Sequence, residues 1–325
     1  MNRTVRLVFT LLRVAIAVAL LFYLGWSGAI SLNALRHLSS GWPLVIVALV
    51  LLGATVVGNA IRLRMLMQAG RLRLSLPSSL RLTLIGMFFN SCLPGAIGGD
   101  VVKIYYATDG NRGRRTEVVT MILLDRVIGM LAMLLWPVLA LPLFARFISG
   151  QAVLQGLLWA AALTAFAIVA ALVVAATAGN SRLLLFVYRR FPLGSYAERV
   201  VETIRSFRDA PGKLFGALLL SLLMHTFAIG AALALAAALN PAGFTWLISL
   251  LIPLGFLANT LPLTPGGLGV GEAAFTKLFG LIGLTGGAEV LLAWRLLTIL
   301  IGLLGLVYYL EGRRRFVHEA VAVSA

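Results

Sequence analysis

The chain has 325 residues, of which 61% are hydrophobic and 12% are charged, and its formal net charge is +16. A soluble domain carries about 25% charged residues, so a single soluble core is a poor interpretation of this composition. The basic residues stand between long apolar segments. The excess of Lys and Arg in cytoplasmic loops explains that placement better than nucleic-acid binding does. We therefore expect a membrane protein without a nucleic-acid partner.

Six apolar segments are long enough to cross a bilayer, for which a helix needs about 20 residues. They are residues 7–25, 43–61, 118–143, 152–177, 214–239 and 289–310. The first segment follows a basic start, as the apolar part of a signal peptide does. Its length predicts a helix that stays in the membrane.

Four shorter apolar segments stand between these spans in two pairs, which are 82–93 with 99–107 and 246–261 with 268–283. A break rich in Pro and Gly separates the members of each pair, LPGAIGG at 93–99 and LPLTPGG at 261–267. Short halves joined by such a break predict either a re-entrant helical hairpin or two short paired crossings.

The loop charges predict the topology. If the N-terminus is cytoplasmic, most loop Lys and Arg residues face the cytoplasm, and only Arg36 and Arg146 lie outside. In this arrangement the loop that begins at Arg62 is cytoplasmic, both termini are cytoplasmic, and the two hairpins enter the membrane from opposite sides.

The order of two spans, one hairpin and one span occurs twice. The first copy is 1–145, with hairpin 82–107; the second is 146–325, with a cytoplasmic amphipathic connector at 178–213 and hairpin 246–283. The two copies start on opposite sides of the membrane. An inverted-topology repeat with helices broken at matching positions points to a transport site near the midplane. The alternative is that the Pro and Gly residues merely kink two structural helices.

Ionisable residues inside membrane segments are candidate functional residues. Glycines at the breaks allow a head group to approach the backbone, and an asparagine near each break can bond either freed backbone groups or a head group. Structural ion pairs and ordinary helix capping remain the alternatives. The candidate substrate-binding residues are Asn90, Gly98, Gly99, Asp100, Lys103, Asp125, Arg126, Asn259, Gly266, Gly267, Glu272 and Arg295.

The sequence contains no pattern typical of an enzyme. There is no phosphate loop of the G-x-x-x-x-G-K type and no Ser/His/Asp set in plausible register. The single cysteine, Cys92, and three scattered histidines provide no metal-ligand spacing. We expect neither catalysis nor a metal or organic cofactor.

Three motifs resemble the lysylphosphatidylglycerol synthase transmembrane family, also called the flippase-like domain family. They are N-x-x-L-P-G-x-x-G-G-D-x-x-K at 90–103, D-R-x-x-G at 125–129 and L-P-x-T-P-G-G-L-G-x-x-E at 261–272. The resemblance covers essentially the whole chain. The family includes the half of the multiple peptide resistance factor that moves aminoacylated phosphatidylglycerol between leaflets. The resemblance therefore implies a multi-pass protein of the bacterial cytoplasmic membrane that acts as a lipid flippase, without the synthase activity.

We expect an all-α polytopic protein that moves a phospholipid or a related amphipathic lipid between leaflets. One alternative is an accessory or scaffold protein of lipid or glycolipid biosynthesis, and another is a small-solute or ion-coupled transporter. A membrane lipid is the expected substrate. A second copy of the chain and a lipid-biosynthetic enzyme are the partners left open.

Overall fold

The computed structural model describes residues 41–92, 98–111, 113–177, 211–241, 244–259 and 269–311. All regular elements within these ranges are helices, and five of them are long and apolar enough to cross a membrane. These are α3 (Trp42–Ala69), α6 (Arg115–Ile148), α7 (Ala152–Thr177), α10 (Pro211–Leu239) and α13 (Gly287–Glu311).

These five helices confirm the predicted long apolar helices at 43–61, 118–143, 152–177, 214–239 and 289–310 and are candidate membrane spans. The predicted first span at 7–25 lies outside the described residues, as does nearly all of the predicted connector at 178–213.

Four short helices occupy the predicted hairpin segments, namely α4 (Leu76–Cys92), α5 (Gly98–Gly110), α11 (Ile248–Asn259) and α12 (Val270–Leu281). The longest of them, α4, has 17 residues. At a rise of about 1.5 Å per residue it spans about 25 Å, which is less than the hydrocarbon thickness of about 30 Å. Helix α4 is therefore at the lower limit for a span, and α5, α11 and α12, with 13, 12 and 12 residues, are too short to cross alone.

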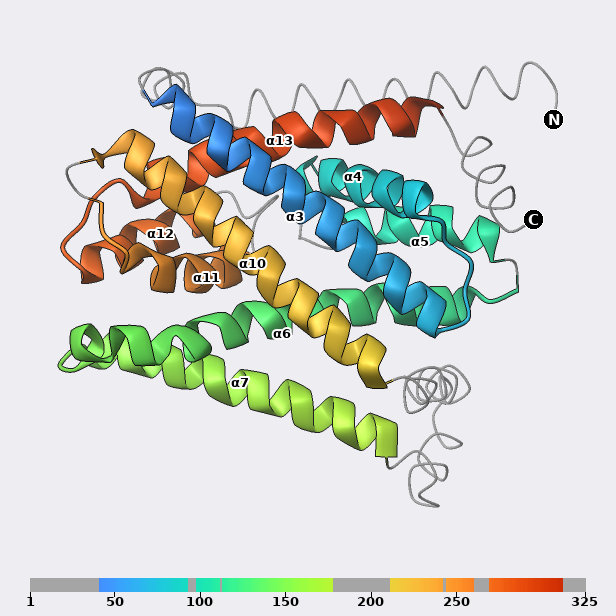
Figure 1. The fold of residues 1–325 in the computed structure, drawn as a ribbon, viewed down its shortest axis with the longest axis horizontal. Coiled ribbons are helices and arrows are strands. Elements are labelled where there is room, and N and C mark those ends of the chain that lie inside the picture. The colour runs from blue at the N-terminus through green and yellow to red at the C-terminus, as the bar shows by residue number, and fades with distance from the viewer. Residues whose placement is uncertain are drawn as a thin grey trace.

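Two antiparallel helices, α3 and α10, run side by side through the middle of the molecule (Figure 1). Their close contacts follow one another in opposite chain directions: Gly58 of α3 lies against Met224, and Met65 lies against Gly216 of α10. Glycines and alanines at this interface allow the two backbones to approach closely.

The two short-helix pairs lie on opposite halves of the long axis, α4 and α5 on one and α11 and α12 on the other (Figure 1). Helix α5 packs on α6, and α12 packs on α13. The other arm of each pair contacts the long helix of the opposite half, since α4 packs on α13 and α11 packs on α6. The neighbours of α4 and α5 in one pair thus match those of α11 and α12 in the other, with α6 and α13 exchanged.

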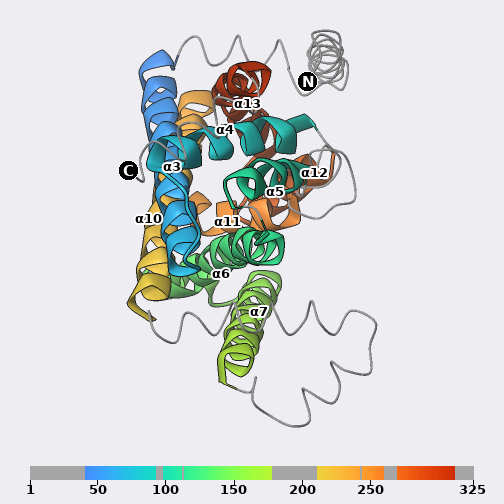
Figure 2. The same ribbon diagram turned by 90° about the vertical axis from the view of Figure 1, so that its right-hand side faces the viewer.

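Helix α7 stands at the edge of the bundle beside α6 (Figure 2). It exposes large apolar side chains, among them Trp159 and Phe166. Such a surface is what a helix facing lipid presents, because lipid tails are as apolar as those side chains.

Candidate functional site

The first hairpin holds an ion-pair cluster at the start of α5. The Asp100 carboxylate accepts a hydrogen bond from Arg126 of α6 at 2.7 Å and a longer one from Lys103 at 3.3 Å. Asp100 is buried, with 6% of its surface exposed. Its partners come from its own helix and from the next long helix, so the cluster fixes α5 against α6.

The start of α5 packs closely against α4. The backbone N–H of Gly99 donates to the Asn90 side-chain oxygen at 2.8 Å. A Cβ placed on Gly99 would collide with the Gly86 carbonyl, so α5 can approach α4 only because this position is glycine. Asn90 therefore bonds the backbone, which was one of its two predicted roles.

The second hairpin holds a similar cluster. The Arg295 guanidinium of α13 lies 3.2 Å from the Glu272 carboxylate and donates to the Asn259 side chain at 2.7 Å. Glu272 also accepts the backbone N–H of Gly269 at 2.7 Å, which caps the start of α12. Glu272 thus forms both an ion pair and a helix cap, which are the two structural alternatives to a binding role. Asn259 accepts its hydrogen bond from an arginine side chain.

The two hairpins share one pattern of residue types. Each first arm ends near an asparagine, each second arm begins with a Gly-acid pair, and each following long helix supplies an arginine. The pattern consists of Asn90, Gly99, Asp100 and Arg126 in the first hairpin and Asn259, Gly271, Glu272 and Arg295 in the second.

By sequence alone, the Gly-Gly pair of the first break, Gly98 and Gly99, matches the Gly-Gly pair of the second break, Gly266 and Gly267. In the structure the glycine equivalent to Gly99 is Gly271, because a Cβ there would collide with the Asn259 side chain. Gly266 and Gly267 lie outside the described residues. Gly98 is the first residue of α5.

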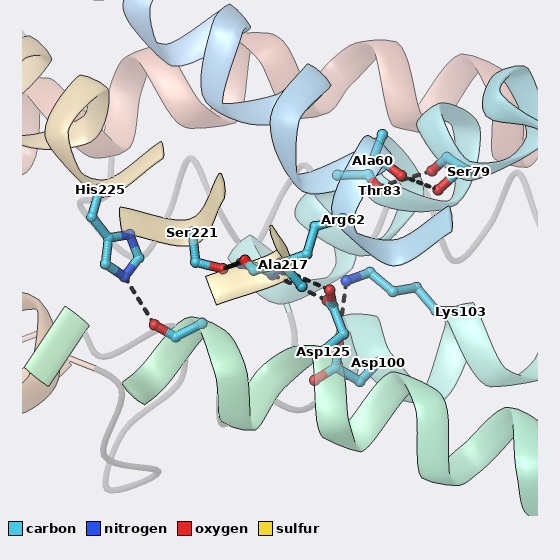
Figure 3. A network of polar contacts seen from close by, with 11 residues as sticks. Ala60, Arg62, Ser79, Thr83, Asp100, Lys103, Asp125, Ala217, Ser221 and His225 are labelled. Carbon is cyan, nitrogen blue, oxygen red and sulfur yellow. Dashed lines mark hydrogen bonds and ion pairs between the residues drawn. The ribbon is translucent and has the colours of Figure 1, made fainter. Parts of the chain in front are cut away.

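A third polar network joins helices α3, α6 and α10 (Figure 3). Arg62 of α3 donates to both carboxylate oxygens of Asp125 of α6, at 2.7 and 3.2 Å, and to the hydroxyl of Ser221 of α10 at 2.9 Å. Arg62 and Asp125 are both 7% exposed. On α10, one turn from Ser221, the His225 ring lies 2.9 Å from the Gly129 carbonyl oxygen of α6.

The prediction that Arg62 begins a cytoplasmic loop was wrong. Helix α3 continues to Ala69, so Arg62 is a helical residue buried among apolar neighbours. Sequence reasoning also missed Ser221 and His225 as partners in this network. The available signal was Asp125 itself, since an acid in an apolar span requires a cationic partner.

The chemistry of these clusters is that of charge recognition. Arg126, Arg295 and Lys103 reach acids in the first turns of the short helices, where such cations can hold a phosphate or a carboxylate with help from the positive helix end. Among the described residues no group of three His, Cys, Asp or Glu side chains is placed to hold a metal ion.

The family model described as the lysylphosphatidylglycerol synthase TM region matches residues 10–305. The chain belongs to this family. The matched residues include both hairpins and the three polar networks described above. Comparison with the curated proteins and with the solved structures gave no significant match.

Proposed function

We propose that this membrane protein moves an amphipathic lipid, such as a phospholipid, between the two leaflets. In this proposal the head group enters a polar region between the two hairpins, and the acyl chains stay in the bilayer. The protein acts as a transporter, not as an enzyme, and works in the bacterial cytoplasmic membrane.

The observation that carries the proposal is the pair of matching charged clusters, Asp100 with Arg126 and Glu272 with Arg295. Charged groups inside apolar helices are costly, and they are typical of transport pathways. Both clusters lie at the start of the second short helix of a hairpin, after the Pro/Gly segment that separates the two helices. A broken helix in a membrane is tolerated where its backbone is buried in protein or lines a water-filled cavity.

The arrangement of the halves supports a two-sided mechanism. The central helices α3 and α10 are antiparallel, and the hairpins occupy opposite ends of the long axis (Figure 1). These features fit two inverted repeats with re-entrant hairpins and cytoplasmic termini. Rocking of one repeat against the other would open the region between the hairpins to each leaflet in turn.

A leaflet-exchange assay tests the proposal. The full chain is placed in liposomes with fluorescent phosphatidylglycerol, and the label that reaches the inner leaflet is followed by its protection from an added reductant. We expect exchange faster than in protein-free liposomes. Asp100→Asn and Glu272→Gln each remove a charge-assisted hydrogen bond of about 1.5–3 kcal/mol, so we expect at least a roughly tenfold slower exchange.

Glu117→Gln is the matched control, because Glu117 pairs with Arg114 at the partly exposed start of α6 and belongs to neither ion-pair cluster. It should exchange lipid like the wild type. If no lipid tested moves faster than in empty liposomes, the transport proposal is wrong.

The second candidate is an accessory protein of lipid or glycolipid biosynthesis. It is favoured by the finding that each charged residue of the two clusters already has a protein partner, as structural ion pairs would. Unchanged function in cells carrying Asp100→Asn or Glu272→Gln, together with a stable complex with a biosynthetic enzyme, would support this candidate over transport.

A further inference from the structure

The two hairpins differ at one position of their shared pattern. In each hairpin the residue three positions after the acid covers a glycine of the opposite arm. Lys103 covers Gly86 in the first hairpin, and Phe275 covers Gly255 in the second. Each of these glycines stands four residues before the hairpin's asparagine, so Lys103 and Phe275 occupy equivalent places.

Packing at this position does not require a charge. Phe275 is 1% exposed and contacts Phe256 and Phe279, so an apolar side chain fills the place in the second hairpin. A lysine in a membrane segment is costly by comparison. The presence of Lys103 in the first hairpin therefore calls for an explanation other than helix packing.

The ammonium of Lys103 is weakly engaged by the protein. An ammonium has three N–H donors, and within the described part of the chain that of Lys103 makes one hydrogen bond, at 3.3 Å, to Asp100. The same carboxylate is held more closely by Arg126, at 2.7 Å. The Asp100 carboxylate is thus shared between the Arg126 and Lys103 cations.

The position of Lys103 directs its charge toward the start of α5. Side chains of a helix lean toward its N-terminus, and the stem of Lys103 lies along Gly86 while its ammonium reaches back to Asp100, in the first turn of α5. The Lys103 side chain is 13% exposed. The N-terminal end of α5 adds a partial positive charge at the same place.

We infer that the first hairpin is an anion site in which Lys103 binds a phosphodiester of a lipid head group, and that the second hairpin, with Phe275 in the equivalent place, binds no anion at that position. The inference rests on the proposed function, because a lipid ligand is what transport supplies. Phosphate suits a lysine, which binds it as a compact point charge. In the second hairpin the aromatic ring of Phe275 takes the place of that charge.

Binding measurements on the full chain in detergent test this inference. Short-chain phosphatidylglycerol, short-chain diacylglycerol and inorganic phosphate are titrated separately, and binding is followed by calorimetry. We expect Lys103→Met, which keeps the length of the side chain, to weaken phosphatidylglycerol binding at least tenfold. Lys103→Arg should retain binding, and diacylglycerol, which lacks phosphate, should bind wild type and variants alike.

Lys277→Met is the matched control, since it removes an exposed lysine of α12 in the second hairpin. Equal weakening by Lys103→Met and Lys277→Met would overturn the inference, because general surface charge would then explain binding. Unchanged phosphatidylglycerol affinity in Lys103→Met would overturn it as well. Lys103→Gln provides a second neutral variant if the methionine variant does not fold.

Inorganic phosphate distinguishes the two sources of the anion. If phosphate alone binds as tightly as the lipid and depends on Lys103, the anion site stands and the lipid ligand does not. The transport proposal can fail separately. If phosphatidylglycerol binds through Lys103 but does not exchange between leaflets, the anion site stands and the proposed flippase activity is wrong.

Discussion

Asp125 and Arg126 follow one another in α6, yet they form ion pairs with different helices. Asp125 pairs with Arg62 of α3, whereas Arg126 pairs with Asp100 of α5. Helix α6 thereby connects the first hairpin to the central pair of helices. At the equivalent place on α13, the residue before Arg295 is Trp294, whose ring contacts that of Phe256 at a tilted angle. The second hairpin is thus attached to α13 by the contacts of Arg295 with Glu272 and Asn259 and by apolar packing.

Loss of the Asp125 charge is expected to destabilise the fold. Asp125→Asn leaves the Arg62 guanidinium buried without its counter-charge, and breaking a buried ion pair costs about 3–5 kcal/mol. Thermal unfolding in detergent measures the loss. The double variant Arg62→Met/Asp125→Leu removes both charges and should be clearly more stable than Asp125→Asn. If Asp125→Asn unfolds at the wild-type temperature, the pair does not stabilise the bundle.

Gly99→Ala should separate the two arms of the first hairpin. The new methyl group would collide with the Gly86 carbonyl, which belongs to the backbone and cannot rotate away. Overpacking of this kind costs about 1–3 kcal/mol, which a lower unfolding temperature would report. Gly156→Ala in α7 is the control, because nothing lies within 4 Å of a Cβ there. An unchanged Gly99→Ala variant would contradict the close approach of α5 to α4.

Arg295→Lys should weaken the second hairpin even though the charge is kept. Arg295 contacts Glu272 and Asn259 together, and a lysine ammonium lacks the planar fork that does this. The loss of one hydrogen bond to a charged group corresponds to about 1.5–3 kcal/mol. Arg146→Lys, at the exposed end of α6, is the matched control. Equal unfolding temperatures for wild type and Arg295→Lys would show that the bridging geometry does not matter.

Hydrophobic length and Pro/Gly breaks are local signals, and they predicted the helices well. The spans from 43 onward and the four short helices all appear near the expected residues. The separate partners of Asp125 and Arg126 could also be expected, because consecutive residues of a helix point to different faces. These predictions succeed because membrane helices must satisfy their backbone hydrogen bonds internally.

The partners themselves could not be predicted from one sequence. Arg62 and Asp125 are 63 residues apart, and Arg62 stood at the edge of an apolar segment, where loop and helix end are hard to distinguish. Nor could spacing alone show that Gly271 is the equivalent of Gly99, because the second break is three residues longer: Asn90 and Gly99 are 9 positions apart, whereas Asn259 and Gly271 are 12 apart. Which residues meet across a bundle depends on tertiary packing.

Site-specific labelling tests the inverted topology directly. In a Cys92→Ser background, single cysteines replace four exposed residues at helix ends, namely Gln68, Arg115, Ser149 and Thr285. The first two end α3 and begin α6, so both should react with a membrane-impermeant thiol reagent from the cytoplasmic side only. Ser149→Cys and Thr285→Cys follow α6 and precede α13, so they should react from the opposite side only. Because α4 and α5 connect α3 to α6, labelling of Gln68→Cys and Arg115→Cys from opposite sides would mean that this pair crosses the membrane, which would rule out a hairpin that returns to the side it entered.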